Sequence, residues 1–271
     1  MTHMPIEVLV ASLEESCPSK LIDRLNLQTP AIICNQTDRY DYWEIERSSG
    51  KVRWFDFDER GVGLNRNNSL IRSTGEICLI ADDDMTFVDG YSEIVEKSFS
   101  RNPNADVIIF NIKESTPTRT VTKREKRVTR LSAYKYGAAR IAFRRQSILN
   151  HRICFSQLFG GGACYSAGED VLFVVDCIKS RLNIIAVPDS IALLNEERDS
   201  TWFKGYSNKL FQDKGALYLS ADGYLMGAIH CVLNALLHHN RYRMEGYSLI
   251  SVIRQELKGL HSFSSSARRS L

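Results

Sequence analysis

The sequence predicts an α/β protein whose mainly parallel sheet is flanked by helices and followed by a C-terminal helical extension. Three observations lead to this prediction. Short apolar runs alternate with amphipathic stretches in the first half of the chain, as expected for strand and helix repeats that build a parallel sheet. Three consecutive acidic residues directly follow one of the apolar runs, at the strand end where such sheets bind ligands. From Asp222 onward the pattern is helical and amphipathic.

The elements of the first half follow one another in a regular order. We expect strands at Ile6–Ala11, Ala31–Cys34, Val52–Phe57, Ile77–Ala81 and Asp106–Ile112. We expect helices between them at Pro18–Leu27, Leu64–Ser73 and Gly90–Phe99, with Gly75 placed to end the second helix. The nearly continuous apolar character of the strands fits a sheet that is covered on both faces.

The second half opens with a polar stretch, Ser115–Arg130, whose basic residues are Lys123, Arg124, Lys126, Arg127 and Arg130. A solvated loop is the simpler interpretation, and a basic lid or an acceptor site facing phosphate groups is the alternative. Further on we expect a strand at Ile141–Phe143, a flexible loop at Gly160–Gly162, a helix along Val171–Ile178, a strand at Ile184–Val187 ended by Pro188, and a frayed tail at Ser262–Leu271.

These elements suggest one domain over residues 1–220 and a helical extension over 221–271. The domain would have a first half of about residues 1–113 and a second half of about 131–220. A chain of 271 residues is long enough for one large α/β domain with a smaller helical addition.

Composition excludes several classes of protein. The net charge of +3 is too small to indicate a nucleic-acid partner by itself. The seven cysteines are odd in number and include no C-x-x-C pair, which argues against a disulfide framework or a zinc site and favours a reducing compartment. We see no signal-peptide pattern, and the most apolar segment, Leu225–Leu237, is interrupted by His230 and Asn234, so we predict a packed helix there. We therefore expect a cytoplasmic protein; the sequence does not indicate an oligomeric state.

The acidic run Asp82-Asp83-Asp84 follows the apolar strand without a break. Three adjacent carboxylates are costly unless cations or hydrogen-bond donors neutralise them. Carboxylate oxygens suit Mg²⁺ or Mn²⁺, which proteins hold with one or two carboxylates plus substrate phosphates. Alternate residues of an extended segment point the same way, so we expect Asp82 and Asp84 to address one ligand while Asp83 points elsewhere. An acidic turn that caps the next helix is the simpler alternative.

A second motif lies just upstream, at Gly61–Leu70 and Thr74–Glu76. Together with the acidic run it resembles glycosyltransferase family 2, whose pattern is a glycine, four residues, Arg-Asn, a short helix, Gly-Glu, an apolar strand and Asp-x-Asp. The matching residues are Gly61, Arg66, Asn67, Gly75, Glu76, Asp82 and Asp84. The resemblance implies the nucleotide-diphosphosugar transferase fold called GT-A. It also implies substrate contacts from Arg66, Asn67, Asp82 and Asp83 and metal ligation by Asp84 and Asp82. Surface decoration of an amphipathic helix is the alternative for Arg66 and Asn67.

The resemblance continues at Gly168-Glu169-Asp170, which opens the predicted helix along Val171–Ile178. Many family members carry Gly-Glu-Asp here and use the aspartate as catalytic base, with the neighbouring glutamate near the substrate. A capping role is the alternative, because acidic residues are favoured in the first turn of a helix. The same placement is expected to keep the Asp170 carboxylate ionised.

The segment Ser200–Tyr206, followed by Asp213-Lys214-Gly215-Ala216, resembles the C-terminal part of bacterial members that build surface polysaccharides. Trp202 would stack on a sugar, although a core aromatic is the commoner role.

The turns after the first two strands depart from the family pattern. The family usually has Asp-Asp-Gly-Ser after its second strand, whereas this chain has Asn35-Gln36-Thr37-Asp38. An asparagine both donates and accepts hydrogen bonds, so Asn35 is expected to contact the nucleotide base. The family's Thr-Tyr-Asn turn after the first strand is replaced by a turn starting at Ser12. Ala11 and Ser12 are expected to line the nucleotide there.

The expected function is transfer of a sugar from a nucleotide diphosphosugar, a UDP-sugar above all, to an acceptor hydroxyl with inversion at the anomeric carbon. The cofactor would be Mn²⁺ or Mg²⁺, and the acceptor a glycan or lipid-linked glycan in bacterial polysaccharide biosynthesis. Contact with the inner face of the membrane, through the basic stretch Lys123–Arg130, is also expected. A nucleotidyltransferase is the nearest enzyme alternative, but the turn Ser12–Ser16 contains no Gly, Lys or Arg to hold a triphosphate. A non-catalytic sugar-nucleotide sensor is the alternative from another class.

Overall fold

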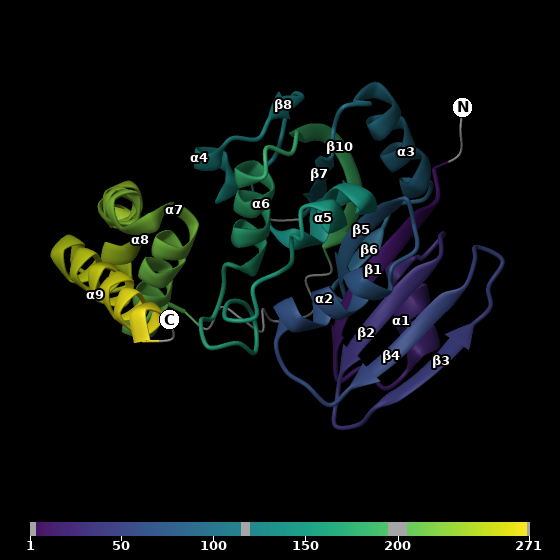
Figure 1. Ribbon diagram of the computed structural model, residues 1–271, viewed down its shortest axis with the longest axis horizontal. Coiled ribbons are helices and arrows are strands. Elements are labelled where there is room, and N and C mark those ends of the chain that lie inside the picture. Colours follow the sequence, from purple (N-terminus) through teal and green to yellow (C-terminus); the bar gives the residue numbers. More distant parts are fainter. Residues whose placement is uncertain (1–3, 115–119, 195–204, 270–271) are drawn as a thin grey trace.

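Most of the protein is a layered α/β structure, and a helical lobe lies at its C-terminal end (Figure 1). The computed structural model describes residues 4–114, 120–194 and 205–269. Within these ranges the strands form one ten-stranded sheet in the order β3-β4-β2-β1-β5-β9-β7-β10-β6, and β8 pairs with β10.

The first part of the sheet is parallel. It contains β4 (Val52–Phe57), β2 (Ala31–Gln36), β1 (Ile6–Leu13) and β5 (Ile77–Asp82), which pair in that order. The edge strand β3 (Asp41–Ile45) runs antiparallel to β4. Sequence analysis did not predict β3, because its residues are mostly exposed and lack the apolar run of the other strands. Stacking of Trp43 on Trp54, with ring centroids 5.6 Å apart, holds β3 on the sheet.

The second part of the sheet is mixed. It contains β9 (Ile141–Arg144), β7 (Val107–Lys113), β10 (Ile184–Leu194), β6 (Met85–Phe87) and β8 (Lys126–Arg127). Only the pairing of β7 with β10 is parallel among these described strands, so the expected parallel arrangement holds for β4, β2, β1 and β5 and not for this second part of the sheet. Strand β10 also continues past Pro188, where we expected it to end. The register shifts between Ala186 and Ser190, so the proline sits at a bulge and does not interrupt the ladder.

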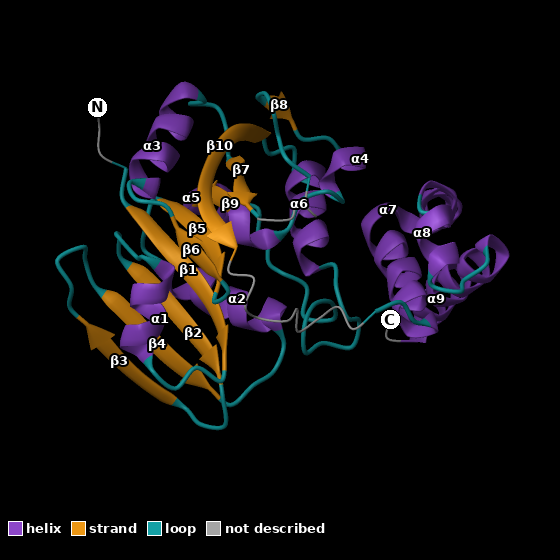
Figure 2. Cartoon of the chain, turned by 180° about the vertical axis from the view of Figure 1, so that it is seen from behind, coloured by secondary structure: helices purple, strands orange, loops and turns teal. Residues whose placement is uncertain are grey.

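Helices cover both faces of the sheet (Figure 2). Alternate strand residues supply two cores: one packs against α1 (Pro18–Leu25) and α3 (Tyr91–Arg101), and the other against α2 (Val62–Arg72), α5 (Arg145–Asn150) and α6 (Glu169–Lys179). Within β1, Val8 and Val10 belong to the first core and Leu9 to the second. Two-sided burial explains why β1 is apolar along almost its whole length. The short elements α4 (Arg130–Ala133) and η1 (Ala138–Arg140) lie between β8 and β9. The α/β fold expected from the sequence is confirmed.

The helical lobe consists of α7 (Asn208–Leu237), α8 (His239–Met244) and α9 (Leu249–Arg269) (Figure 1). Helix α7 therefore begins before residue 221, where we placed the start of the extension, and Gly223 breaks it with φ 76° and ψ 179°. Helix α9 runs through the tail that we expected to fray. The two long helices approach closely, because a Cβ on Gly215 would lie 1.8 Å from the Glu256 carbonyl oxygen. Only glycine fits at that crossing.

Candidate active site

The carboxyl ends of β1, β2 and β5 bring several predicted site residues together. In the ladder Ala11 lies beside Asp82, and Ser12 lies beside Asn35. Because parallel strands end at the same edge of the sheet, residues far apart in sequence meet there. Asp83 joins this group, since its Oδ2 accepts hydrogen bonds from the Ser12 hydroxyl at 3.0 Å and from the Leu13 N–H at 3.3 Å.

Arg66 links the two acidic motifs. Its side chain comes from α2 and is almost fully buried. One guanidinium nitrogen donates to Asp82 Oδ1 at 2.6 Å, and the other donates to Glu169 Oε1 at 2.7 Å. Burial alone would lower the pKa of Arg66, but Asp82 and Glu169 outweigh it and raise the pKa. Asp82 at the end of β5 and Glu169 at the start of α6 are 87 positions apart in the sequence (169 − 82). They share Arg66 as their cationic partner.

The two acidic residues at the start of α6 have different environments. Glu169 is buried, and its second oxygen accepts from the Gly168 N–H at 3.2 Å. Asp170 is partly exposed, and its Oδ1 accepts from the Val171 N–H at 2.7 Å. Loss of hydration raises the pKa of Asp170 to about 7, with the negative charge of Glu169 as the next cause, while Arg66 opposes the rise. The start of α6 therefore favours the ionised form of Asp170 less strongly than we expected, because loss of hydration and the charge of Glu169 oppose it.

The loop before α6 is held in place from two sides. Gly160 adopts φ 108°, and a Cβ there would lie 2.6 Å from Val62 Cγ1 and 2.7 Å from Glu169 Oε2, so the loop can sit against α2 only with a glycine. From the helical lobe, Asp213 accepts from both the backbone N–H and the hydroxyl of Ser166, at 3.0 and 2.8 Å. Sequence reasoning did not identify Asp213 as part of the site. The only available signal was the resemblance of the Asp213–Ala216 segment.

A divalent cation would need ligands from outside the protein at this edge. Across the described ranges, no three His, Cys, Asp or Glu side chains are grouped so as to hold a metal ion. Asp82, Asp83 and Asp84 are each partly exposed, and Mg²⁺ is commonly bound by one or two carboxylates with substrate phosphates. The residues fit an open site that a phosphate completes. Strand β5 ends at Asp82 and a turn follows, so the alternation of side chains along a strand stops there. Joint ligation by Asp82 and Asp84 stays a prediction.

Two other predicted residues do not present their side chains as expected. Asn67 donates to the Phe155 carbonyl and accepts from the Phe155 N–H, both at 2.8 Å, so its amide anchors the chain before the glycine loop. Asn35 is fully buried and bonds to the Glu15 backbone and to Asp56. We include neither among the proposed substrate contacts, because protein groups occupy their amides. Trp202 lies outside the described residues.

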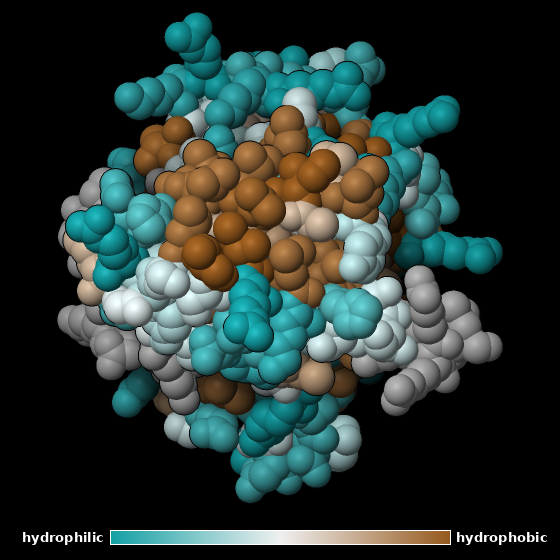
Figure 3. Space-filling model, turned by 90° about the vertical axis from the view of Figure 1, so that its left-hand side faces the viewer, coloured by the Kyte–Doolittle hydropathy of each residue, from teal (hydrophilic) through white to brown (hydrophobic). Residues whose placement is uncertain are grey.

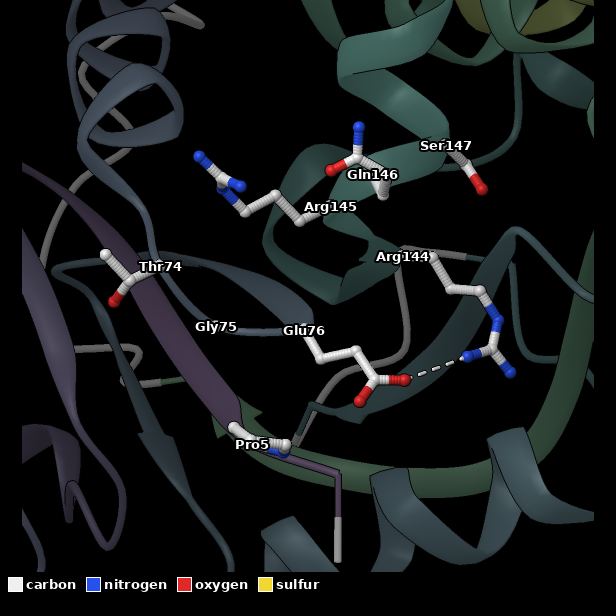
Figure 4. A pocket seen from close by; sticks show the side chains of 8 residues that line it. All are labelled: Pro5, Thr74, Gly75, Glu76, Arg144, Arg145, Gln146 and Ser147. Carbon is white, nitrogen blue, oxygen red and sulfur yellow. Dashed lines mark hydrogen bonds and ion pairs between the residues drawn. The ribbon is translucent and has the colours of Figure 1, made fainter.

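A cavity of about 350 Å³ opens at the opposite edge of the sheet (Figure 4). It is lined by Pro5, Thr74, Gly75, Glu76, Arg144, Arg145, Gln146 and Ser147. Pro5 and Glu76 precede β1 and β5, so this cavity lies at the amino ends of the strands that carry the acidic residues at their carboxyl ends. The ion pair of Glu76 with Arg144, at 3.4 Å, crosses it. The cavity is therefore separate from the acidic site.

The fold matches that of a solved enzyme structure. No protein-family model matches the chain, and no curated protein matches it significantly. S. aureus TarS residues 1–349 in complex with UDP-GlcNAc aligns with a TM-score of 0.66 at 16% identity, over 96% of this chain and 80% of that one. The complex of the same TarS fragment with UDP aligns with a TM-score of 0.57 at 13% identity, over 99% and 92%. At this identity the likeness shows a shared GT-A fold.

Proposed function

We propose that the protein is a glycosyltransferase that moves a sugar from a nucleotide diphosphosugar, expected to be a UDP-sugar, to an acceptor hydroxyl. The observation that carries the proposal is the Arg66 bridge, which places the acidic end of β5 next to Asp170 at the start of α6. The acidic end of β5 suits a cation and a diphosphate, and Asp170 at the start of α6 suits a general base. The fold shared with TarS, which was crystallised with UDP-GlcNAc and with UDP, supports a nucleotide-sugar donor.

The donor side is formed by the strand ends. Asp84 and Asp82 would hold Mn²⁺ or Mg²⁺, which when bound stabilises the negative charge that develops on the departing diphosphate. Ala11 and Ser12, at the end of β1, lie within the same edge and are proposed to line the nucleotide. Asp83 is fixed by the Ser12 hydroxyl, so its role is to shape the turn that carries Asp84. Arg66 holds Asp82 and Glu169 in place and keeps their charges from repelling each other.

The acceptor side centres on Asp170. In the proposed reaction the acceptor oxygen forms a bond to the anomeric carbon while the bond from that carbon to the diphosphate oxygen breaks. The electron pair of the broken bond leaves with the nucleotide diphosphate, and the acceptor proton moves to the Asp170 carboxylate. A pKa of about 7 suits this base, because at neutral pH a large share is ionised and the proton affinity is still high. A single displacement of this kind inverts the anomeric configuration.

Donor turnover tests the proposal. The purified chain is incubated with UDP-sugars and Mn²⁺, and release of UDP is followed with and without glycan or lipid-linked glycan acceptors. We expect UDP release from at least one donor, and a loss of about 10²–10⁴-fold in Asp170→Asn, the range for removal of a general base. Asp176→Asn is the matched control, since Asp176 is a partly exposed carboxylate on the same helix.

The same assay separates the alternatives. UDP binding without turnover in the wild type would indicate a sugar-nucleotide sensor. Near-normal turnover in Asp170→Asn would remove the assignment of the base while leaving the donor site in place. Release of pyrophosphate from a nucleoside triphosphate and a sugar phosphate would indicate a nucleotidyltransferase.

A further inference from the structure

The second segment of α7 has an apolar face on the outside of the protein. Between Gly223 and the end of the helix, every exposed residue is apolar or aromatic: Tyr224, Leu225, Met226, Ile229, Val232, Leu233, Leu236 and Leu237. We call these residues the α7 stripe. Figure 3 shows an apolar patch on this side of the molecule with hydrophilic groups around it. A helix that meets only water normally carries polar residues on its outer face, and contiguous apolar patches of this kind mark interaction surfaces.

The opposite face of the same segment is packed inside the lobe. Cys231 and Ala235 are buried there, and Asn234 donates to Glu256 of α9 at 2.5 Å. Sequence analysis predicted a packed helix over Leu225–Leu237, and this is confirmed for one face only. The α7 stripe therefore lies on the outer surface of a helix whose inner face is already packed.

The segment is too short to cross a bilayer. Helix α7 as a whole, with 30 residues and a mean hydropathy of 1.3 in its most apolar window, is long and apolar enough by composition to span a membrane. The break at Gly223 leaves only Tyr224–Leu237, which at about 1.5 Å per residue is about 21 Å long, against about 30 Å for a hydrocarbon core. The part before the break carries Asp213 and Lys214, which bond within the protein. Burial of one face by protein and the short length both favour a helix that lies along an interface.

The exposed charged side chains of the helical lobe are mostly basic. Within residues 205–265 the exposed acidic and basic side chains are Lys209, Arg241, Arg243, Arg254, Lys258 and Glu245, so five of six are basic. Arg241 and Arg243 directly follow the stripe in α8. At its other end Arg130 pairs with Asp222 and donates to the Ala221 carbonyl at 2.9 Å, so the β8–α4 segment lies beside the break in α7.

We infer that the α7 stripe docks on an anionic lipid surface, with the helix in the plane of the membrane. The apolar side chains would enter the boundary of headgroups and acyl chains, and the arginines would contact lipid phosphates. A second copy of the chain is a poorer partner, because pairing two stripes would bring together two lobes whose exposed charges are mostly basic. The inference does not depend on the proposed transfer reaction. Through Asp213, which holds the loop before α6, the docked lobe would set the acceptor half of the site near the membrane.

Vesicle flotation of the full chain tests this inference. We expect the protein to float with vesicles of equal parts phosphatidylglycerol and phosphatidylcholine and to stay in solution with phosphatidylcholine alone. Leu233→Gln/Leu236→Gln changes two exposed leucines of the stripe and should weaken binding by about tenfold or more. Ile71→Gln is the matched control, since Ile71 is 73% exposed but lies on α2. Arg241→Glu/Arg243→Glu should remove the preference for anionic vesicles.

Two measurements without lipid complete the test: the oligomeric state of the protein in solution, and UDP release from the donor. The stripe variant should keep the wild-type melting temperature and UDP release, so that loss of flotation reports the surface alone. Wild-type protein that stays in solution with anionic vesicles would overturn the inference. A wild-type dimer that becomes monomeric in Leu233→Gln/Leu236→Gln, with flotation unchanged, would assign the stripe to contact between copies and would also overturn it.

Discussion

The two ends of the protein each contain a buried cluster of charged side chains, and the clusters differ in what surrounds them. At the strand ends, Arg66 lies between Asp82 and Glu169, with the partly exposed Asp170 beside them. In the helical lobe, Glu256 is fully buried and accepts from Asn234 at 2.5 Å, while Lys214 donates to Tyr242 at 2.9 Å.

The difference is in net charge and exposure. The Arg66 cluster has more carboxylates than cations, and Asp82 and Asp170 are partly exposed to solvent. In the Glu256 cluster, burial raises the pKa of Glu256 to about 8, opposed by the nearby Lys214, and burial lowers the pKa of Lys214. Both groups are thereby moved toward their neutral forms, which is the cheaper arrangement for ionisable side chains packed in the interior of the lobe. In this protein, uncompensated buried charge lies at the proposed active site, and buried groups shifted toward neutrality lie in the scaffold.

Removing the central cation should give the largest effect. Arg66→Met keeps the length of the side chain but leaves Asp82 and Glu169 without their partner, so we expect a loss of about 3–5 kcal/mol in the free energy of unfolding. Donor turnover should be lost with it. Arg47→Met, which breaks an exposed pair with Asp23, should cost about 1 kcal/mol or less. Equal costs in chemical denaturation would show that the Arg66 bridge is not a structural centre.

Adding a methyl group where α7 and α9 cross should have the next largest effect on stability. The destabilisation should be confined to the helical lobe. Gly215→Ala places a methyl group against the Glu256 carbonyl, so we expect about 1–3 kcal/mol of destabilisation. Gly161→Ala adds the same group where no atom lies within 4 Å and should change stability little. Denaturation melts of both variants check this. Similar melts would contradict the close approach of α7 and α9.

The titration of Asp170 should be visible in both rate and stability. Because the base must be ionised, kcat/KM should fall about tenfold per pH unit below about 7 and level off above it. The folded pKa lies above the ordinary value of 3.8, so the folded state binds more protons than the unfolded state between about pH 4 and 7. Stability should therefore decrease as pH rises through that window. Asp170→Asn should remove this part of the dependence, and a rate profile that is flat from pH 5 to 8 would exclude Asp170 as the base.

Neutralising the scaffold cluster should have the smallest effect. Glu256→Gln keeps the shape and an acceptor for Asn234, so below about pH 4.5, where the carboxyl is largely protonated in both the folded and the unfolded states, stability should change by about 1 kcal/mol or less. The folded pKa of Glu256 is raised to about 8 from an ordinary 4.5, so wild-type stability should fall as pH rises between these values. The variant should show a shallower fall in melts across that range. If stability falls with pH in Glu256→Gln as steeply as in the wild type, or if the variant loses donor turnover, the distinction between scaffold and site would be wrong.

The strand-end half of the site was predictable because its chemistry is local in sequence. Asp82, Asp83 and Asp84 follow a buried strand, and Arg66 lies one helix upstream of it, so a parallel sheet alone brings them close. Asp170 was predicted only from the family resemblance at Gly168-Glu169-Asp170, and its raised pKa, which depends on loss of hydration and on Glu169, was not predicted.

The remaining features depend on contacts between distant segments. The hydrogen bonds of Asp213 to Ser166 and of Asn67 to Phe155 join residues 47 and 88 positions apart, and neither pair has a local signature. The α7 stripe was hidden for a related reason, because a one-sided helix has the same apolar pattern whether its outer face meets protein, lipid or water.

Calorimetric titration of UDP in the presence of Mn²⁺ tests most directly whether the acidic end of β5 and the start of α6 form one nucleotide-sugar site with separate tasks. We predict that UDP binds the wild type only when Mn²⁺ is present and that Asp84→Asn weakens binding about tenfold or more. Asp170→Asn and the nearby exposed control Asp89→Asn should bind as the wild type does. Wild-type protein that does not bind UDP with Mn²⁺, or Asp84→Asn protein that binds it as tightly as wild type, would contradict the account.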